Sequence, residues 1–236
     1  MYARETASWR AQAIGQDVVD LALAVPWLIV AAIATLRGSR RASLALGSGL
    51  GFAAYSFVVY AFDVRFNQMF LVYCAILGVS TYGLIALAAH GAARHLRADV
   101  LAPAPRRVAS VTLIASATLF ALMWLGEDVP AIVRGAPPAS LMDVGLATNA
   151  VHVLDLSLVL PAMLVSGVLL WRQRRMGHAL ASIAMGFCVL MELNIAGIMI
   201  AMQRLGVAAT SSMVWVFTGL AAFAAVLLVS LLRAVR

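Results

Sequence analysis

The stretch from residue 18 to residue 52, VVDLALAVPWLIVAAIATLRGSRRASLALGSGLGF, decides the fold because it occurs a second time in altered form. It aligns without a gap on residues 153 to 187, with ten of 35 positions identical. The identities that are least expected by chance in apolar segments involve polar residues or proline: Asp20 with Asp155, Pro26 with Pro161, Arg37 with Arg172, and Arg40 with Arg175. We therefore expect an internal duplication, and such duplications organise many membrane proteins around a shared central site.

The composition places the chain in a lipid bilayer. Hydrophobic residues make up 64% of the sequence and charged residues only 11%, whereas a soluble domain carries roughly 25% charged residues. Seven apolar stretches can each cross the hydrocarbon layer as a helix. They cover approximately residues 18–36, 42–62, 66–89, 107–125, 151–171, 179–202 and 212–232. These stretches lack the alternation of barrel strands, so the sequence predicts an all-α, polytopic membrane helical bundle of seven transmembrane helices.

The seven spans divide into two triplets and a connecting span. MFLVY at 69–73 resembles MVWVF at 213–217, which extends the duplication into the third span of each half. We expect a single membrane domain over residues 1–236, with repeat one at about 17–90, a linking span at about 106–126 and repeat two at about 149–233. Because one crossing joins them, both triplets run in the same direction, which makes them parallel three-helix repeats.

The placement of arginine predicts the topology. The chain has 17 arginines, no lysine and a net charge of +7. Twelve arginines lie in the connections after spans 1, 3 and 5 or at the C-terminal end: Arg37, Arg40, Arg41, Arg94, Arg97, Arg106, Arg107, Arg172, Arg174, Arg175, Arg233 and Arg236. The positive-inside rule assigns these segments to the cytoplasm of a plasma (inner) membrane and the N-terminus to the outside. The lipid bilayer is thus the expected partner, and nucleic acid is not, since no long basic face with interleaved aromatics exists.

A group of polar residues opens the first span of each half. Asp17 aligns with His152 and Asp20 with Asp155, so both halves carry two polar residues at i, i+3 on one helix face. Asn149 extends the second set to Asn-x-x-His-x-x-Asp. If spans 1 and 5 meet, three carboxylates and one imidazole would converge, and such a set could bind a divalent cation or shuttle protons. The competing interpretation is that the carboxylates only cap helix N-termini.

Acidic residues gather at the outer end of the predicted spans. Eight of the ten lie there: Glu5, Asp17, Asp20, Asp63, Glu127, Asp128, Asp143 and Asp155. One interpretation is that acids collect outside simply because arginine is kept inside. The other is an acidic vestibule that attracts cations or protonated solutes.

Glu192 lies near the middle of span 6, where a carboxylate costs several kcal/mol unless it is paired, protonated or hydrated. Two roles fit this position: a structural hydrogen bond between helices, with Tyr55 or Tyr60 as candidate partners, or proton or solute binding. Asn194 is close in sequence but about 200° round the helix, so the two side chains should face different neighbours. Both residues are candidate site residues.

Pro26 and Pro161 lie inside their spans at matching positions of the two halves. A proline inside a helix frees a backbone carbonyl one turn earlier. Paired breaks at matching positions of two repeats are expected at a transport site or a hinge, whereas a single membrane proline is often only a kink. We therefore treat the two prolines as candidate hinges.

Two resemblances follow from these features. Seven spans with an outside N-terminus and a three-one-three arrangement resemble the SWEET sugar transporters in topology, and no sugar-binding residues are carried over. The segments YAFDVRFNQMFLVY at 60–73, NAVHVLDLSLVLP at 149–161 and LLWRQRR at 169–175 are similar to a set of bacterial polytopic membrane proteins. A covalent retinal pigment is excluded because the chain has no lysine for a Schiff base.

Taken together, the residues favour a transporter or binding protein for a small solute or ion. The alternatives are a membrane-embedded metal-dependent enzyme that uses the Asp/His set, and a non-catalytic sensor or subunit of a membrane complex. No serine-hydrolase, zinc-protease, P-loop or dinucleotide motif stands where it could work, so neither catalytic residues nor a cofactor is predicted. A homo-oligomer or a complex with another membrane protein is compatible with this composition.

Overall fold

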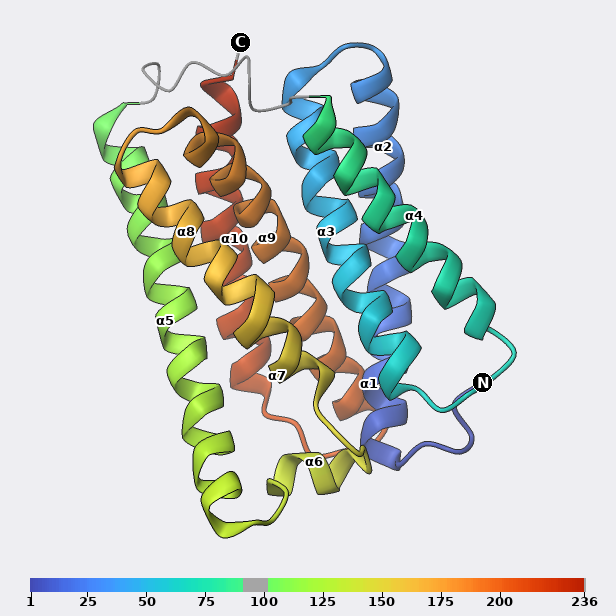
Figure 1. Ribbon diagram of the computed structural model, residues 1–236. Coiled ribbons are helices and arrows are strands. Elements are labelled where there is room, and N and C mark those ends of the chain that lie inside the picture. Colours follow the sequence, from blue (N-terminus) through green and yellow to red (C-terminus); the bar gives the residue numbers. More distant parts are fainter. Residues whose placement is uncertain (91–101, 236) are drawn as a thin grey trace.

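The computed structural model describes residues 1–90 and 102–235, and within these residues every regular element is a helix (Figure 1). Seven helical stretches in this part of the chain are long and apolar enough to cross a membrane. This confirms the predicted helical membrane bundle. Arg94, Arg97 and Arg236, which the sequence assigns to the cytoplasmic side, lie outside the described residues.

The first span of each half is a helix interrupted by a π-helical turn. In the first half, α1 (Ala7–Val19) continues through η1 (Asp20–Ala24) into α2 (Val25–Leu36). In the second half, α7 (Ala150–Leu154) continues through η3 (Asp155–Val159) into α8 (Leu160–Trp171). The remaining elements are α3 (Arg40–Asp63), α4 (Phe70–Ala89), α5 (Pro103–Arg134), the short α6 (Ala139–Val144), α9 (Arg175–Arg204) and α10 (Ser211–Arg233).

Several helices extend beyond the apolar stretches that predict them. The first span begins at Ala7 and not near residue 18, because Thr6 caps the helix: its Oγ1 accepts a hydrogen bond from the Trp9 backbone N–H at 3.2 Å. The fourth span continues to Arg134 and ends at Gly135, which adopts a left-handed φ of 66°. Hydropathy finds the part of a helix that matches the hydrocarbon layer, and polar turns beyond it go unnoticed.

The connections sort to two ends of the bundle. Figure 1 shows the α2–α3 turn, the α8–α9 turn and the C-terminus at one end, which we call the Arg-rich end. The N-terminus, the α3–α4 connection and α6 lie at the opposite end, which we call the acidic end. The arginine-bearing turns thus share one side of the molecule. That this side faces the cytoplasm stays a prediction.

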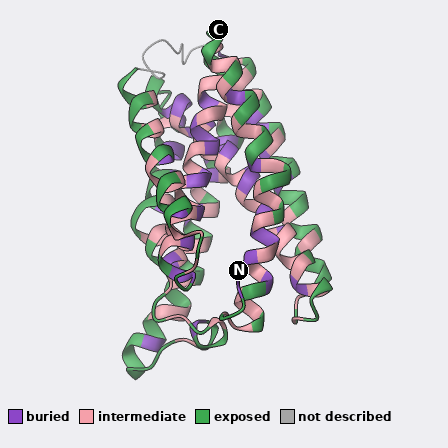
Figure 2. Ribbon diagram, turned by 90° about the vertical axis from the view of Figure 1, so that its right-hand side faces the viewer, coloured by how far each residue is buried: buried purple, intermediate pink, exposed green. Residues whose placement is uncertain are grey.

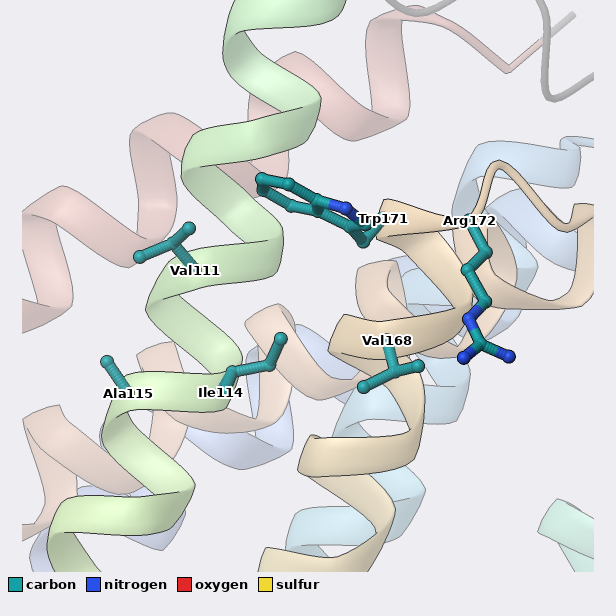
Figure 3. A pocket seen from close by; sticks show the side chains of 6 residues that line it. All are labelled: Val111, Ile114, Ala115, Val168, Trp171 and Arg172. Carbon is teal, nitrogen blue, oxygen red and sulfur yellow. The ribbon is translucent and has the colours of Figure 1, made fainter.

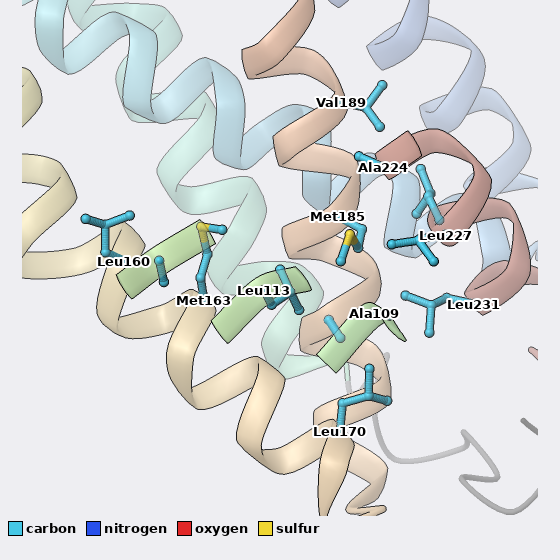
Figure 4. Close-up of a cluster of buried hydrophobic side chains, with 13 residues drawn as sticks. Ala109, Leu113, Leu160, Met163, Leu170, Met185, Val189, Ala224, Leu227 and Leu231 are labelled. Atoms are coloured by element: carbon cyan, nitrogen blue, oxygen red, sulfur yellow. The ribbon is translucent and has the colours of Figure 1, made fainter. Parts of the chain in front are cut away.

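The largest buried cluster lies among α5, α8, α9 and α10. It includes Leu113 of α5, Leu170 of α8, Met185 of α9 and Leu231 of α10, and each of these side chains is at most 2% exposed (Figure 4). Outward faces of the helices are largely exposed in the isolated chain (Figure 2). This distribution fits a bundle whose outer surface meets lipid.

Two close helix crossings join the first half to α9. Gly15 of α1 lies against the backbone of Ile198, so that an added Cβ would stand 2.7 Å from the Ile198 Cα. Gly186 of α9 lies against Ser48 of α3 in a similar way. Small residues at such crossings let membrane helices approach closely enough for dispersion to hold them together.

Candidate functional site

Polar residues on α1 and on the segments around it gather at the acidic end, and we call this group the Asp17 network: Tyr2, Gln16, Asp17, Asp20, Ser56, Tyr60 and Asn194. It consists of two hydrogen-bonded sets, one around Asp17 and one around Gln16. The Tyr60 hydroxyl of α3 donates to Asp17 Oδ1 at 2.8 Å and also lies 3.1 Å from the Ala13 carbonyl. Asp17 therefore ties α1 to α3 at this depth.

Tyr2 closes the Asp17 network from the N-terminal side. Its side chain is only 6% exposed, and its hydroxyl donates to Asp17 Oδ2 at 2.9 Å. The same segment is fixed at two further points, since Arg65 N–H donates to Glu5 Oε1 at 2.8 Å and Thr6 Oγ1 donates to the Val144 carbonyl at 3.2 Å. Burial, and then the nearby Asp17 carboxylate, raise the pKa of the Tyr2 phenol above its ordinary value of 10.0.

Gln16 links the Asp17 network to the second half. Its Nε2 donates to Asp20 Oδ1 at 2.9 Å and lies 3.4 Å from Ser56 Oγ of α3. Its Oε1 accepts a hydrogen bond from Asn194 Nδ2 of α9. Gln16 and Asn194 are both buried, so this amide pair holds α1 and α9 together away from water.

His152 and Asp155 of the second half belong to a separate group, the Asp155 network, which also includes Tyr55 of α3 and Trp124 and Asp128 of α5. Trp124 of α5 donates its indole N–H to Asp155 Oδ2 at 2.8 Å. The Tyr55 hydroxyl of α3 also interacts with the Asp155 carboxylate. Asp155 thus contacts both the linking helix and the first half.

His152 is held on two sides within the Asp155 network. Its Nδ1 lies 3.0 Å from Asp128 Oδ1, and its ring lies against Trp124 with centroids 4.2 Å apart. The side chain is 5% exposed. A carboxylate on Nδ1 fixes the orientation of the imidazole, which is an arrangement suited to binding or passing a proton.

The expected convergence of all four residues into one set is wrong. Asp17 and Asp20 belong to one network and His152 and Asp155 to the other. Among the described residues no group of three or more His, Cys, Asp or Glu side chains could hold a metal ion. The physical reason is that each carboxylate finds its donors on neighbouring helices: Tyr60 for Asp17 and Trp124 for Asp155.

Glu192 lines a small cavity among α5, α8, α9 and α10. The cavity measures about 20 Å³, and the residues around it are Thr112, Leu113, Ser116, Met163, Met185, Cys188, Glu192, Leu220, Phe223 and Ala224. Glu192 Oε2 is buried without a hydrogen-bond partner among the described residues. A cavity of this size accommodates about one water molecule, and the hydroxyls of Thr112 and Ser116 supply the further polar partners that such a water needs.

Glu192 and Asn194 face opposite sides of α9, in agreement with their predicted angular separation. Asn194 contacts Gln16 of α1, whereas Glu192 faces α5 and α10. Neither tyrosine expected as a partner hydrogen-bonds Glu192 within the described residues: Tyr60 bonds Asp17, and Tyr55 interacts with Asp155.

The two breaks in the first spans have the same local structure. The Val25 N–H bonds the Asp20 carbonyl, and the Leu160 N–H bonds the Asp155 carbonyl, each across five residues. Pro26 and Pro161 are the second residues of the α-helices that follow. Each aspartate thus begins a π-helical turn and each proline stands just past its end, so Asp20 and Asp155 occupy equivalent backbone positions. π-turns of this kind are frequent at functional sites.

Sequence reasoning missed Tyr2, Gln16, Trp124 and Asp128 as members of the networks. Tyr2 precedes every periodic segment, so no pattern could place it. The signal for Trp124 and Asp128 was available, since they lie one helical turn apart on span 4, in register with the polar opening of span 5. Reading span 4 as only a linker concealed it.

We found no match to this chain among protein-family models, curated proteins or solved structures.

Proposed function

We propose that the protein is a transporter of small cations or protonated solutes, in which buried carboxylates couple binding to movement. The observation that carries the proposal is the matched break: in both halves an aspartate opens a π-helical turn immediately before a proline. Interrupted helices expose backbone carbonyls beside the carboxylate, and transporters use such interruptions to bind ions and to bend.

Packing between α3 and α9 supports the proposed duplication. Tyr55 of α3 meets Phe187 of α9 edge to face, with centroids 5.7 Å apart. Phe187 aligns with Phe52, and extending the alignment by three residues pairs Tyr55 with Leu190; Phe52 and Leu190 share a buried cluster. Reciprocal contacts of this kind are expected across a two-fold axis. Such an axis between α3 and α9 would run along the membrane normal and relate two parallel repeats.

The distribution of charge supports a cationic substrate. Asp17, Asp20 and Asp155 lie toward the acidic end and would form the binding residues there, with His152 beside Asp155 as a proton acceptor. Asn194 of the second half would contribute through its hydrogen bond to Gln16 of the first half. Glu192 would be a further carboxylate, nearer the middle of the bilayer, for a proton or cation. Pro26 and Pro161 would act as hinges. The acidic end would face the outside, as the arginine distribution predicts.

Uptake into proteoliposomes tests this function. We expect purified protein to accumulate radiolabelled methylammonium or rubidium when the lumen is made more acidic or electrically negative. Asp155→Asn removes the charge but keeps the shape, and it should lower uptake at least tenfold. The matched control is Asp143→Asn on α6, whose side chain is exposed, and this variant should transport normally. Equal rates for the two variants would refute the proposed role of Asp155.

A sensor or subunit of a membrane complex is the second candidate. The observation that favours it is the size of the cavity at Glu192, about 20 Å³, which accommodates about one water molecule. Under this alternative Glu192→Gln and Glu192→Leu would leave uptake unchanged. A partner protein or a second copy of the chain would then be recovered by crosslinking in the membrane.

A further inference from the structure

An apolar groove runs between α5 and α8 near the Arg-rich end. Its volume is about 530 Å³, and it is lined by Val111, Ile114, Ala115, Val168, Trp171 and Arg172 (Figure 3). Trp171 reaches from α8 toward α5, and the Arg172 side chain extends along the α8 wall toward Val168. The groove is thus apolar along its length, and Arg172 places one positive charge at its end.

The floor of the groove is a close helix contact. Gly167 of α8 lies against α5, where an added Cβ would stand 2.7 Å from Ile114 Cγ1 and 3.0 Å from the Ser110 carbonyl. Because backbone and short side chains form this contact, the two walls are held at a fixed separation. The groove is therefore a feature of the packed helices and does not depend on one flexible side chain.

Positive charge stands at the mouth of the groove on both walls. Arg172 ends the α8 wall, and Arg107 lies one helical turn before Val111 on the same stripe of α5. Within residues 1–90 and 102–235, no carboxylate lies within salt-bridge distance of either arginine. Neither charge is thus neutralised by a carboxylate of the part of the chain that the structure describes, and both can interact with an anion in the bilayer.

We propose that this groove binds an anionic phospholipid, with an acyl chain between α5 and α8 and the phosphate at Arg172 and Arg107. The apolar lining suits a hydrocarbon chain, and the two arginines complement the headgroup. Trp171 is half exposed, as expected for an indole at headgroup level. Basic pockets between membrane helices recognise anionic headgroups by this combination. The proposal is independent of transport.

Trp171 provides the readout. The full-length protein is reconstituted into phosphatidylcholine vesicles that contain the same mole fraction of brominated phosphatidylglycerol or brominated phosphatidylcholine. Bromine quenches indole fluorescence on contact, and the Trp171→Phe variant supplies the background from the other tryptophans. We expect stronger quenching of Trp171 by the brominated phosphatidylglycerol. Arg172→Gln should reduce this preference about fivefold, since one arginine near an anionic surface contributes about that factor.

The control is Arg134→Gln, an exposed arginine at the opposite end of α5, which should keep the full preference. Equal quenching of Trp171 by both brominated lipids would show ordinary boundary lipid and overturn the proposal. An unchanged preference in Arg172→Gln would do the same. Excess soluble glycerol phosphate should not displace the lipid, because it lacks a chain for the groove, and displacement would refute the acyl-chain contact.

Discussion

At the scale of single residues, Asp17 shows how a carboxylate is kept inside a membrane span. It accepts hydrogen bonds from Tyr2 at the N-terminal side and from Tyr60 on α3. Each bond to a charged acceptor is worth about 1.5 to 3 kcal/mol. The two phenols therefore offset a large part of the desolvation cost of the carboxylate and fix where α1 lies against α3.

Tyr60→Phe removes one of these donors without changing the shape of the ring. We expect the free energy of unfolding to fall by about 1.5 to 3 kcal/mol, because the partly buried carboxylate loses a partner. Thermal unfolding in detergent measures this change. Tyr82→Phe on α4, where the ring is exposed, is the matched control and should unfold like the wild type. Equal melting temperatures for all three proteins would contradict the assigned role of Tyr60.

Tyr2 gives a prediction about pH. Its phenol has a pKa raised above 10.0 in the folded protein, so folding favours the protonated form. The stabilisation is fully present below pH 10 and is lost as the pH rises above 10, where the unfolded chain begins to release the proton. The melting temperature of the wild type should fall more steeply above pH 10 than that of Tyr2→Phe. Parallel slopes for the two proteins between pH 9 and 11 would refute this linkage.

At the scale of the helix, the crossing of α1 and α9 depends on Gly15. An added side chain there would meet the backbone of Ile198, which cannot give way as a flexible side chain can. Gly15→Val should therefore destabilise the protein by about 1 to 3 kcal/mol through overpacking. Gly78→Val on α4 is the control, because a Cβ at Gly78 meets nothing within 4 Å. A similar melting temperature for both variants would show that α1 and α9 separate easily.

The number and type of elements could be predicted from sequence, while their ends and their polar contacts could not. The apolar stretch at 151–171 predicted the fifth span almost to the residue, since Asn149 caps it where the hydrophobic pattern begins. The first span was predicted eleven residues too short because Thr6 and not hydropathy starts the helix. The partition of the acids into two networks depends on Trp124 and Tyr60, which lie on other helices, so the sequence of the first spans alone does not reveal it.

At the scale of the whole molecule, one end of the bundle is rich in arginine and the other in acidic residues. Which end faces the cytoplasm can be measured. In a chain with Cys74 and Cys188 replaced by Ala, Arg174→Cys lies in the α8–α9 turn and Ala136→Cys in the connection between α5 and α6. The first connection is at the Arg-rich end of the bundle and the second at the acidic end (Figure 1). An impermeant maleimide added to intact cells should label only Ala136→Cys, since arginine-rich connections stay in the cytoplasm. Labelling of Arg174→Cys alone would invert the topology and remove the basis for an outward acidic vestibule.

The two interrupted spans pack against different numbers of neighbouring helices, and this difference affects how easily each can bend. α8 is clamped between α5 and α9, whereas α2 packs on α3 and buries only Ala31. Bending of α8 at Pro161 must displace α5 or α9, whereas bending of α2 at Pro26 away from α3 displaces mainly acyl chains. α2 in the first half should therefore bend more easily than α8 in the second half. Bilayer thickness and viscosity should act on the motion of this protein mainly through its first thirty-six residues.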